Sequence, residues 1–187
     1  SGYLKNLSDI FISKMEPIQM NIFKLAGEEF NISSPKQLGE ILYNKLGLKG
    51  GKKGKSGLYS TSANVLEKLG QDGNEICKLI LNWRALQKLK STYSDALVDQ
   101  INSVTGRVHT HFQMTGAMTG RFSSSNPNLQ NIPIKSEDGR AIRRAFIAQK
   151  GMKIVACDYS QIELRLLAEV ANIEPLIEAF KNNIDIH

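Results

Sequence analysis

The sequence predicts an α+β fold, with helices in the first 100 residues and an antiparallel sheet in the remainder. Between Leu4 and Leu25 apolar residues recur every three or four positions, as one buried face of a helix requires. From Ile101 the pattern changes: GRVHTHFQMTG alternates like a strand, and AFIA and KIVAC flank Lys150-Gly151 as the arms of a hairpin. A chain of 187 residues buries roughly 70 % of its unfolded surface, so it is long enough to form a core.

The first helices are delimited by proline, glycine and serine. Pro17 lies inside the first apolar pattern, where we expect it to kink or break the helix, and Gly27 follows as a C-cap. Ser33-Ser34-Pro35 predicts a second, shorter helix, because serine is a favoured N-cap and proline suits the first turn. The predicted apolar face of that helix consists of Leu38, Ile41 and Leu42.

A basic, glycine-rich segment separates these helices from the next pair. GLKGGKKGKSGLYSTS, residues 47–62, predicts a flexible loop; it does not match the phosphate-binding pattern G-x-x-x-x-G-K-[ST]. Ser62 is placed to cap a short helix, and a longer helix follows from Asn74. The longer helix carries Arg84 and Lys88 four residues apart on one side, and its predicted buried residues are Ile76, Leu79, Ile80, Trp83 and Leu86.

The charge is basic and unevenly distributed. The formal net charge is +6; residues 153–187 hold three bases and six acids, a net −3, so the first 152 residues carry +9. This arrangement suits a polyanion beside a cation site, although charge alone fits an ordinary solvated surface better. No apolar run reaches membrane length and no leader peptide opens the chain. We therefore expect a cytoplasmic protein without a membrane partner, and Cys77 and Cys157 as inert buried thiols.

The stretch KIVACDYSQIELRLLAEV, residues 153–170, is the best candidate for chemistry. We expect a buried strand through Ile154, Val155 and Cys157 to end at Asp158 and to hold its carboxylate where a metal ion could bind. Ser160 to Glu163 has the spacing of a capping box. On the simpler alternative, Asp158 only ends a strand and Glu163 only completes a cap.

Two further features bear on function. TGRFSSSNPNLQNIPIK, residues 119–135, is rich in the hydroxyl, amide and guanidinium groups that contact phosphates, sugars and base edges. His109 and His111 lie on the same face of the predicted strand, but no cysteine or carboxylate stands at ligand spacing. We therefore interpret the two histidines as surface or half-buried residues and not as a metal site.

TGRFSSSNPNLQNIP followed by DYSQIELR resembles the signature of family A DNA polymerases, the group typified by bacterial DNA polymerase I. FNISSPKQL, STS and LQKLKSTY are also similar to the thumb of that family, so the resemblance runs essentially from end to end. It implies a right-hand polymerase, with residues 1–100 as a helical thumb whose basic tip loop is 47–61. Residues 101–187 would then be the N-terminal part of an antiparallel-sheet palm, ending at the start of the fingers.

The resemblance also implies roles for individual residues. Asp158 matches the palm carboxylate that binds both catalytic Mg²⁺ ions, and the Tyr159 carbonyl matches a second ligand of the ion that holds the triphosphate. Glu163 matches the steric gate that excludes a ribose 2′-hydroxyl, and His187 matches a histidine at the incoming deoxynucleoside triphosphate. The residues that match contacts to primer–template DNA are Arg121, Asn128, Gln130, Asn131, Arg84, Lys88, Ser60, Thr61, Lys52, Lys53 and Lys55.

The sequence departs from the family pattern in three ways. Ala117-Met118 replaces a usual Thr-Ala, and Lys135 replaces a common arginine. Only 29 residues follow Asp158, too few for the fingers helix and the second metal-binding carboxylate. With Ser1 in place of methionine and no stop signal at the end, we expect a fragment. Because Asp158 alone should bind Mg²⁺ weakly, we expect this fragment to be inactive alone. A palm cut in this way exposes sheet edges that could pair two copies as a homodimer.

Two other interpretations remain open. A single-subunit RNA polymerase has a similar palm, but a small residue stands at its gate position, and the large acidic Glu163 argues against that class. A non-catalytic, polymerase-like DNA-binding module is the alternative from another class. The intact DYSQIELR argues against such a module, and a second palm carboxylate downstream would exclude it.

Overall fold

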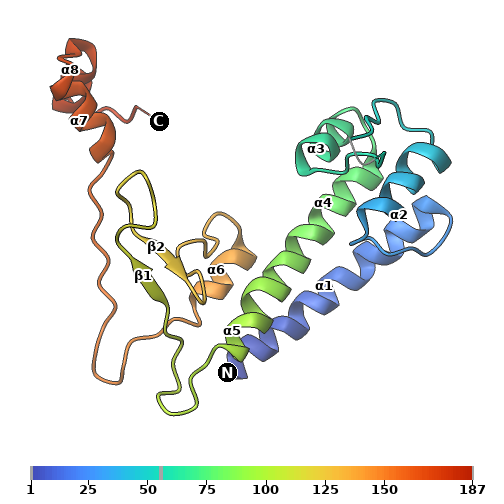
Figure 1. The fold of residues 1–187 in the computed structure, drawn as a ribbon, viewed down its shortest axis with the longest axis horizontal. Coiled ribbons are helices and arrows are strands. Elements are labelled where there is room, and N and C mark those ends of the chain that lie inside the picture. The colour runs from blue at the N-terminus through green and yellow to red at the C-terminus, as the bar shows by residue number, and fades with distance from the viewer. Residues whose placement is uncertain (1, 55–56, 187) are drawn as a thin grey trace. The chain divides into compact units, whose positions relative to one another are not determined.

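The computed structural model describes residues 2–54 and 57–186. They form two compact units, divided between Phe146 and Ile147. The first unit contains α1 (Gly2–Ala26), α2 (Pro35–Gly39), η1 (Glu40–Lys45), α3 (Ala63–Gln71), α4 (Glu75–Lys88), η2 (Leu89–Asp95), α5 (Ala96–Asp99), β1 (His111–Gln113), β2 (Ser123–Ser125) and α6 (Glu137–Arg143) (Figure 1). The second unit contains α7 (Ile162–Val170) and α8 (Glu174–Lys181). Helices together with an antiparallel β1–β2 pair confirm the predicted α+β class.

The core of the first unit lies between α1 and α4, which run side by side in Figure 1. The apolar periodicity that predicted both helices is the buried face of each. Buried residues of α1 are Leu4, Leu7, Phe11, Met15, Ile22 and Ala26, and those of α4 are Ile76, Cys77, Ile80, Trp83 and Leu86. Leu79, which we expected to be buried, is only half-buried. No helix in the part of the chain that the structure describes is long and apolar enough to cross a bilayer.

The predicted break at Pro17 does not occur, because α1 continues through Pro17 to Ala26. Proline cannot donate to the carbonyl four residues earlier, that of Ser13. Both Pro17 and Ser13 lie on the exposed side of α1, where water can satisfy that carbonyl. Met15 and Ile22 are buried on the opposite side, so packing holds the two halves of the helix together.

The predicted helix ends are largely confirmed. The Ser34 hydroxyl accepts a hydrogen bond from the Gln37 backbone N–H at 3.4 Å, and Pro35 is the first residue of α2. Gly27 ends α1 with a φ of 73°, a conformation that glycine adopts without steric cost. Ser62 is the N-cap of α3 as predicted, but its side chain makes no capping hydrogen bond.

The basic loop is anchored on η1 by two tyrosines. The Tyr43 hydroxyl donates to the Ser60 carbonyl at 3.1 Å, and the Tyr59 hydroxyl donates to Asn44 Oδ1 at 2.8 Å. An antiparallel bridge joins Lys53 to Tyr59, and the Lys53 ammonium lies 4.8 Å from the centroid of the Tyr59 ring. The base of the loop is therefore fixed. Lys55, a predicted DNA contact, lies outside the described residues.

The β-structure is much smaller than predicted. Only His111 to Gln113 of the alternating segment forms a strand, paired with Ser123 to Ser125. The hairpin expected from AFIA and KIVAC is wrong, since residues 147–159 contain no strand and the Ile154 and Val155 side chains are 65 % and 80 % exposed. β-branched residues form a strand only where a neighbouring strand bonds their backbone, and no described segment pairs with this one.

The two cysteines consequently lie in different environments. Cys77 is fully buried on α4, and burial raises the pKa of its thiol to about 11. Cys157 is exposed, so its predicted burial is wrong for the same reason as the predicted strand.

We expect a thiol reagent at pH 8 to modify Cys157 rapidly in the folded chain and to leave Cys77 unmodified until denaturant unfolds α4. Peptide mapping by mass spectrometry measures each site separately. Cys157→Ser removes the fast reaction and serves as the control. Equal rates at both thiols before unfolding would contradict the burial of Cys77.

The second unit is a helix pair preceded by an extended segment. α7 and α8 pack against each other and bury Ala168 and Phe180 between them. The Arg165 guanidinium lies 4.5 Å from the centroid of the Phe180 ring, a cation–π contact that joins the two helices.

Candidate nucleic-acid interface

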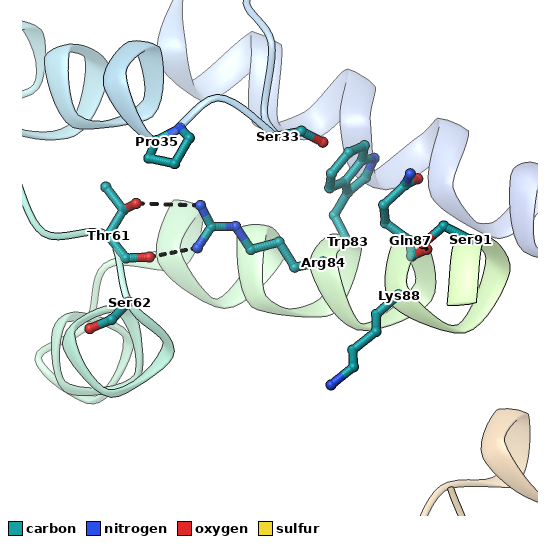
Figure 2. Close-up of a pocket in the computed structure, with 9 residues that line it drawn as sticks. All are labelled: Ser33, Pro35, Thr61, Ser62, Trp83, Arg84, Gln87, Lys88 and Ser91. Carbon is teal, nitrogen blue, oxygen red and sulfur yellow. Dashed lines mark hydrogen bonds between the residues drawn. The ribbon is translucent and has the colours of Figure 1, made fainter. Parts of the chain in front are cut away.

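A pocket of about 540 Å³ lies beside α4 (Figure 2). It is lined by hydroxyl groups and two cationic side chains, with the Trp83 ring and Pro35 as its apolar part. The polar lining residues are Ser33, Thr61, Ser62, Arg84, Gln87, Lys88 and Ser91. Hydroxyls and cations of this kind are the groups that proteins use to contact phosphate and sugar oxygens.

Within the pocket, Arg84 fixes the segment that precedes α3. Its Nη1 donates to the Thr61 carbonyl at 2.6 Å and its Nη2 to Thr61 Oγ1 at 3.4 Å, as the dashed lines in Figure 2 mark. Burial lowers the pKa of Arg84. Lys88 is exposed one turn further along α4, and no hydrogen bond joins it to the other pocket residues drawn in Figure 2. Arg84 therefore holds Thr61 and the segment around it in place, and Lys88 carries a positive charge that is exposed to solvent.

The segment 119–135 is held by a pair of hydroxyls, of which that of Ser124 is buried and that of Thr110 is half-buried. Thr110 Oγ1 and Ser124 Oγ lie 2.7 Å apart, and Ser124 is buried. The Leu129 backbone N–H donates to Ser124 Oγ at 3.0 Å, and the Thr110 hydroxyl donates to the Pro127 carbonyl at 2.7 Å. These contacts fix the loop that follows β2.

Two of the predicted contact residues also stabilise this loop. Asn128 Oδ1 accepts from the Gln130 backbone N–H at 3.0 Å, and Gln130 Nε2 donates to the Phe122 carbonyl at 2.9 Å. Together with Arg121 and Asn131 they are exposed at the surface of the loop. The loop thus presents four predicted contact residues on an ordered backbone.

The predicted metal-binding and nucleotide-binding residues belong to the second unit. Asp158 and Tyr159 are exposed, and the Asp158 carboxylate makes no hydrogen bond or ion pair with any described residue. The strand expected to hold Asp158 is absent, but its carboxylate is open to a ligand. His187 lies outside the described residues.

The predicted capping box is wrong. α7 begins at Ile162 after Gln161, whose φ of 53° is left-handed and whose side chain makes no cap. This residue separates Ser160 from the helix, and the Ser160 carbonyl instead accepts from Arg165 Nε at 3.0 Å. Gln161 Nε2 donates to Asp185 Oδ1 at 2.6 Å, which ties the turn to the chain beyond α8. Glu163 is the second residue of α7, exposed, where the helix dipole favours a carboxylate.

The two histidines are exposed, in agreement with the prediction. His109 lies outside β1, so it does not share a strand face with His111 as we expected, and its Nε2 lies 2.7 Å from Thr105 Oγ1. Among the described residues, no three His, Cys, Asp or Glu side chains gather as a metal site.

An exposed lysine at a hydroxyl-lined pocket, and amides on an ordered loop, are typical of proteins that bind nucleic acid. The sequence pattern of DNA polymerase family A matches residues 1–187. The chain belongs to that family, as its two signature motifs predicted.

Individual relatives agree with this assignment. The chain is 52 % identical over 184 residues to DNA polymerase I of Rhizobium leguminosarum and 50 % identical over 187 residues to the thermostable DNA polymerase I of Thermus aquaticus. These matches cover 98 % and 100 % of this chain but 18 % and 22 % of the relatives, so the chain spans about a fifth of their length. A solved structure, the POL domain of Pol1 from M. smegmatis in complex with DNA primer-template and dNTP, matches with a TM-score of 0.88 and 39 % identity. That match covers 100 % of this chain and 33 % of the other.

Proposed function

We propose that this chain is part of a complete, template-directed DNA polymerase of replication and repair, which adds deoxynucleotides to a primer 3′-hydroxyl. The observation that carries the proposal is the family match over residues 1–187, with about half of the residues identical to those of bacterial DNA polymerase I. The related solved structure was determined with primer-template DNA and dNTP, which supports the same partners here. Primer extension by the complete polymerase, dependent on the template base, is the direct test.

We propose that residues 1–100 are the thumb, with its tip at 47–61, and that residues 101–187 begin the palm. The pocket beside α4 then faces the sugar–phosphate backbone of the duplex, with Lys88, Ser60 and the tip lysines Lys52, Lys53 and Lys55 as contacts. Arg84 acts mainly by holding Thr61. Arg121, Asn128, Gln130 and Asn131 face the bases and sugars of the primer–template.

The residues present suit Mg²⁺, which prefers oxygen ligands and uses one or two carboxylates together with substrate phosphates. Asp158, through its exposed carboxylate, and Tyr159, through its carbonyl, would hold the metal. Bound Mg²⁺ would lower the pKa of the primer hydroxyl and stabilise the charge that develops on the phosphates. Glu163, on the first turn of α7, excludes a ribose 2′-hydroxyl, and His187 contacts the triphosphate.

A non-catalytic DNA-binding module is the alternative. The 187-residue chain holds one carboxylate of the proposed metal site, so we expect it to bind duplex DNA without extending a primer. A gel assay with labelled primer, dNTPs and Mg²⁺ measures extension, and any extension by the purified chain would contradict this expectation. Extension by the complete polymerase excludes the alternative. Homodimerisation and location in the cytoplasm stay predictions.

Duplex binding by the chain should depend steeply on salt, because each neutralised phosphate releases condensed counterions. We expect Lys88→Ala to weaken binding to duplexes of any sequence and to reduce the slope of log K against log salt by about 1. Fluorescence anisotropy at several salt concentrations measures both. Lys24→Ala removes an exposed lysine of α1 that does not line the pocket, and it should leave the slope unchanged. An unchanged slope for Lys88→Ala would mean that Lys88 does not contact phosphate.

A further inference from the structure

Five consecutive backbone carbonyls, those of residues 131–135, accept hydrogen bonds from side chains of the first unit. The Tyr93 hydroxyl donates to the Asn131 carbonyl. Arg143 donates from Nη2 to the Ile132 carbonyl at 3.0 Å and from Nε to the Pro133 carbonyl at 3.1 Å. Arg140 Nη1 lies 3.4 Å and 3.1 Å from the carbonyl oxygens of residues 134 and 135.

The side chains that hold these carbonyls are themselves anchored. Tyr93 lies on the π-helical segment η2 and is only 5 % exposed. Arg140 and Arg143 lie one turn apart on α6, whose Ile142 is fully buried. Lys14 of α1 forms an ion pair with Asp138 at 2.6 Å, which ties α6 to the helical body.

Arg140 and Arg143 stand close to a third arginine, Arg144, at the end of α6. The guanidinium groups of Arg140 and Arg143 nevertheless bond the protein's own backbone. A hydrogen bond to a carbonyl restrains the plane of its peptide group, so Tyr93 restrains the 131–132 peptide and Arg143 restrains the next two. Together these bonds limit the directions in which the Asn131 side chain can leave the chain. The neighbouring Gln130 is fixed from the other side through Phe122 and Asn128. Tyr93 and Arg143 thus hold the backbone from Asn131 onward, whereas Phe122 and Asn128 hold Gln130.

We propose that Tyr93 and Arg143 are positioning residues that aim the side chain of Asn131, beside Gln130, at the minor-groove edge of the primer–template. This inference rests on the proposed function. Amides can donate to the purine N3 and pyrimidine O2 acceptors that line the minor groove. A misplacement of about 1 Å is enough to weaken such a contact strongly.

The test uses primer extension by the complete polymerase on primer–templates in which one guanine near the primer end is replaced by 3-deazaguanine, which lacks the N3 acceptor. We expect at least one position where this replacement slows the wild-type enzyme about tenfold and slows Asn131→Ala much less. We call this loss of extension rate the 3-deazaguanine penalty. At that position the penalty should fall below about threefold in Tyr93→Phe and in Arg143→Lys. Lysine keeps the charge of Arg143 but lacks the rigid planar fork by which the guanidinium reaches two successive carbonyls.

Tyr3→Phe is the matched control, because the Tyr3 hydroxyl donates to the Ala141 carbonyl of α6 at 2.9 Å and does not contact residues 131–135. It should retain the full penalty. If Tyr93→Phe and Arg143→Lys slow extension but keep the full penalty, their role is only to stabilise the fold and the inference is wrong. Absence of any penalty in the wild-type enzyme also overturns it. A wild-type enzyme that extends no primer overturns the proposed function itself.

Discussion

Asp158→Asn should lower the rate of primer extension by the complete polymerase about a thousandfold or more, which corresponds to about 4 kcal/mol of activation free energy. Asparagine has nearly the same shape but lacks the charge that holds a divalent cation. Because Asp158 is exposed and its carboxylate makes no hydrogen bond or ion pair with any described residue, the substitution should leave Tm unchanged. Single-turnover extension at saturating DNA measures the chemical step without the contribution of DNA binding.

The control for this substitution is Glu169→Gln, which removes one exposed negative charge from α7 in the same unit. We expect it to extend primers at the wild-type rate. Raising the Mg²⁺ concentration should recover part of the activity of Asp158→Asn, since the loss is one of metal affinity. Wild-type activity in Asp158→Asn would show that Asp158 is not a metal ligand.

Glu163→Ala should relax the selection of sugars, with discrimination against ribonucleotides reduced about a hundredfold. The alanine side chain leaves space for the 2′-hydroxyl that the larger Glu163 excludes. The ratio of kcat/KM for a deoxynucleotide to that for the matching ribonucleotide, measured in the complete polymerase, reports this directly.

Two further variants separate size from charge. Glu163→Gln keeps the size of the side chain and should retain most of the discrimination, whereas Glu169→Ala on the same helix should have no effect. If discrimination is unchanged in Glu163→Ala and only Tm falls, then Glu163 serves solely to stabilise the first turn of α7.

The helical part of the chain could be predicted because its signals are local. Ser34 and Pro35 start α2, Gly27 ends α1, and the apolar periodicity of α4 becomes its buried face. Each of these signals acts within one or two turns. Pro17 shows the limit of such reasoning, because packing of the residues around it outweighs a local breaker.

Features that depend on distant residues could not be predicted in this way. The segment around Val155 has strand-forming residues but no described partner strand, and Ser160 has the right spacing for a cap but is separated from α7 by the left-handed Gln161. The bonds from Arg84 to Thr61 and from Tyr93 to Asn131 join residues 23 and 38 positions apart, and no spacing pattern indicates them. The polar segments 47–62 and 119–135 could be recognised from the sequence, but the hydrogen bonds that hold them in place could not.

A hybrid enzyme tests the central claim most directly. In the thermostable DNA polymerase I of Thermus aquaticus, this chain can replace the segment that it matches. We predict that the hybrid incorporates the deoxynucleotide complementary to each template base, and that Asp158→Asn in the hybrid abolishes incorporation. A folded hybrid that binds primer–template DNA but incorporates no nucleotide would contradict the account.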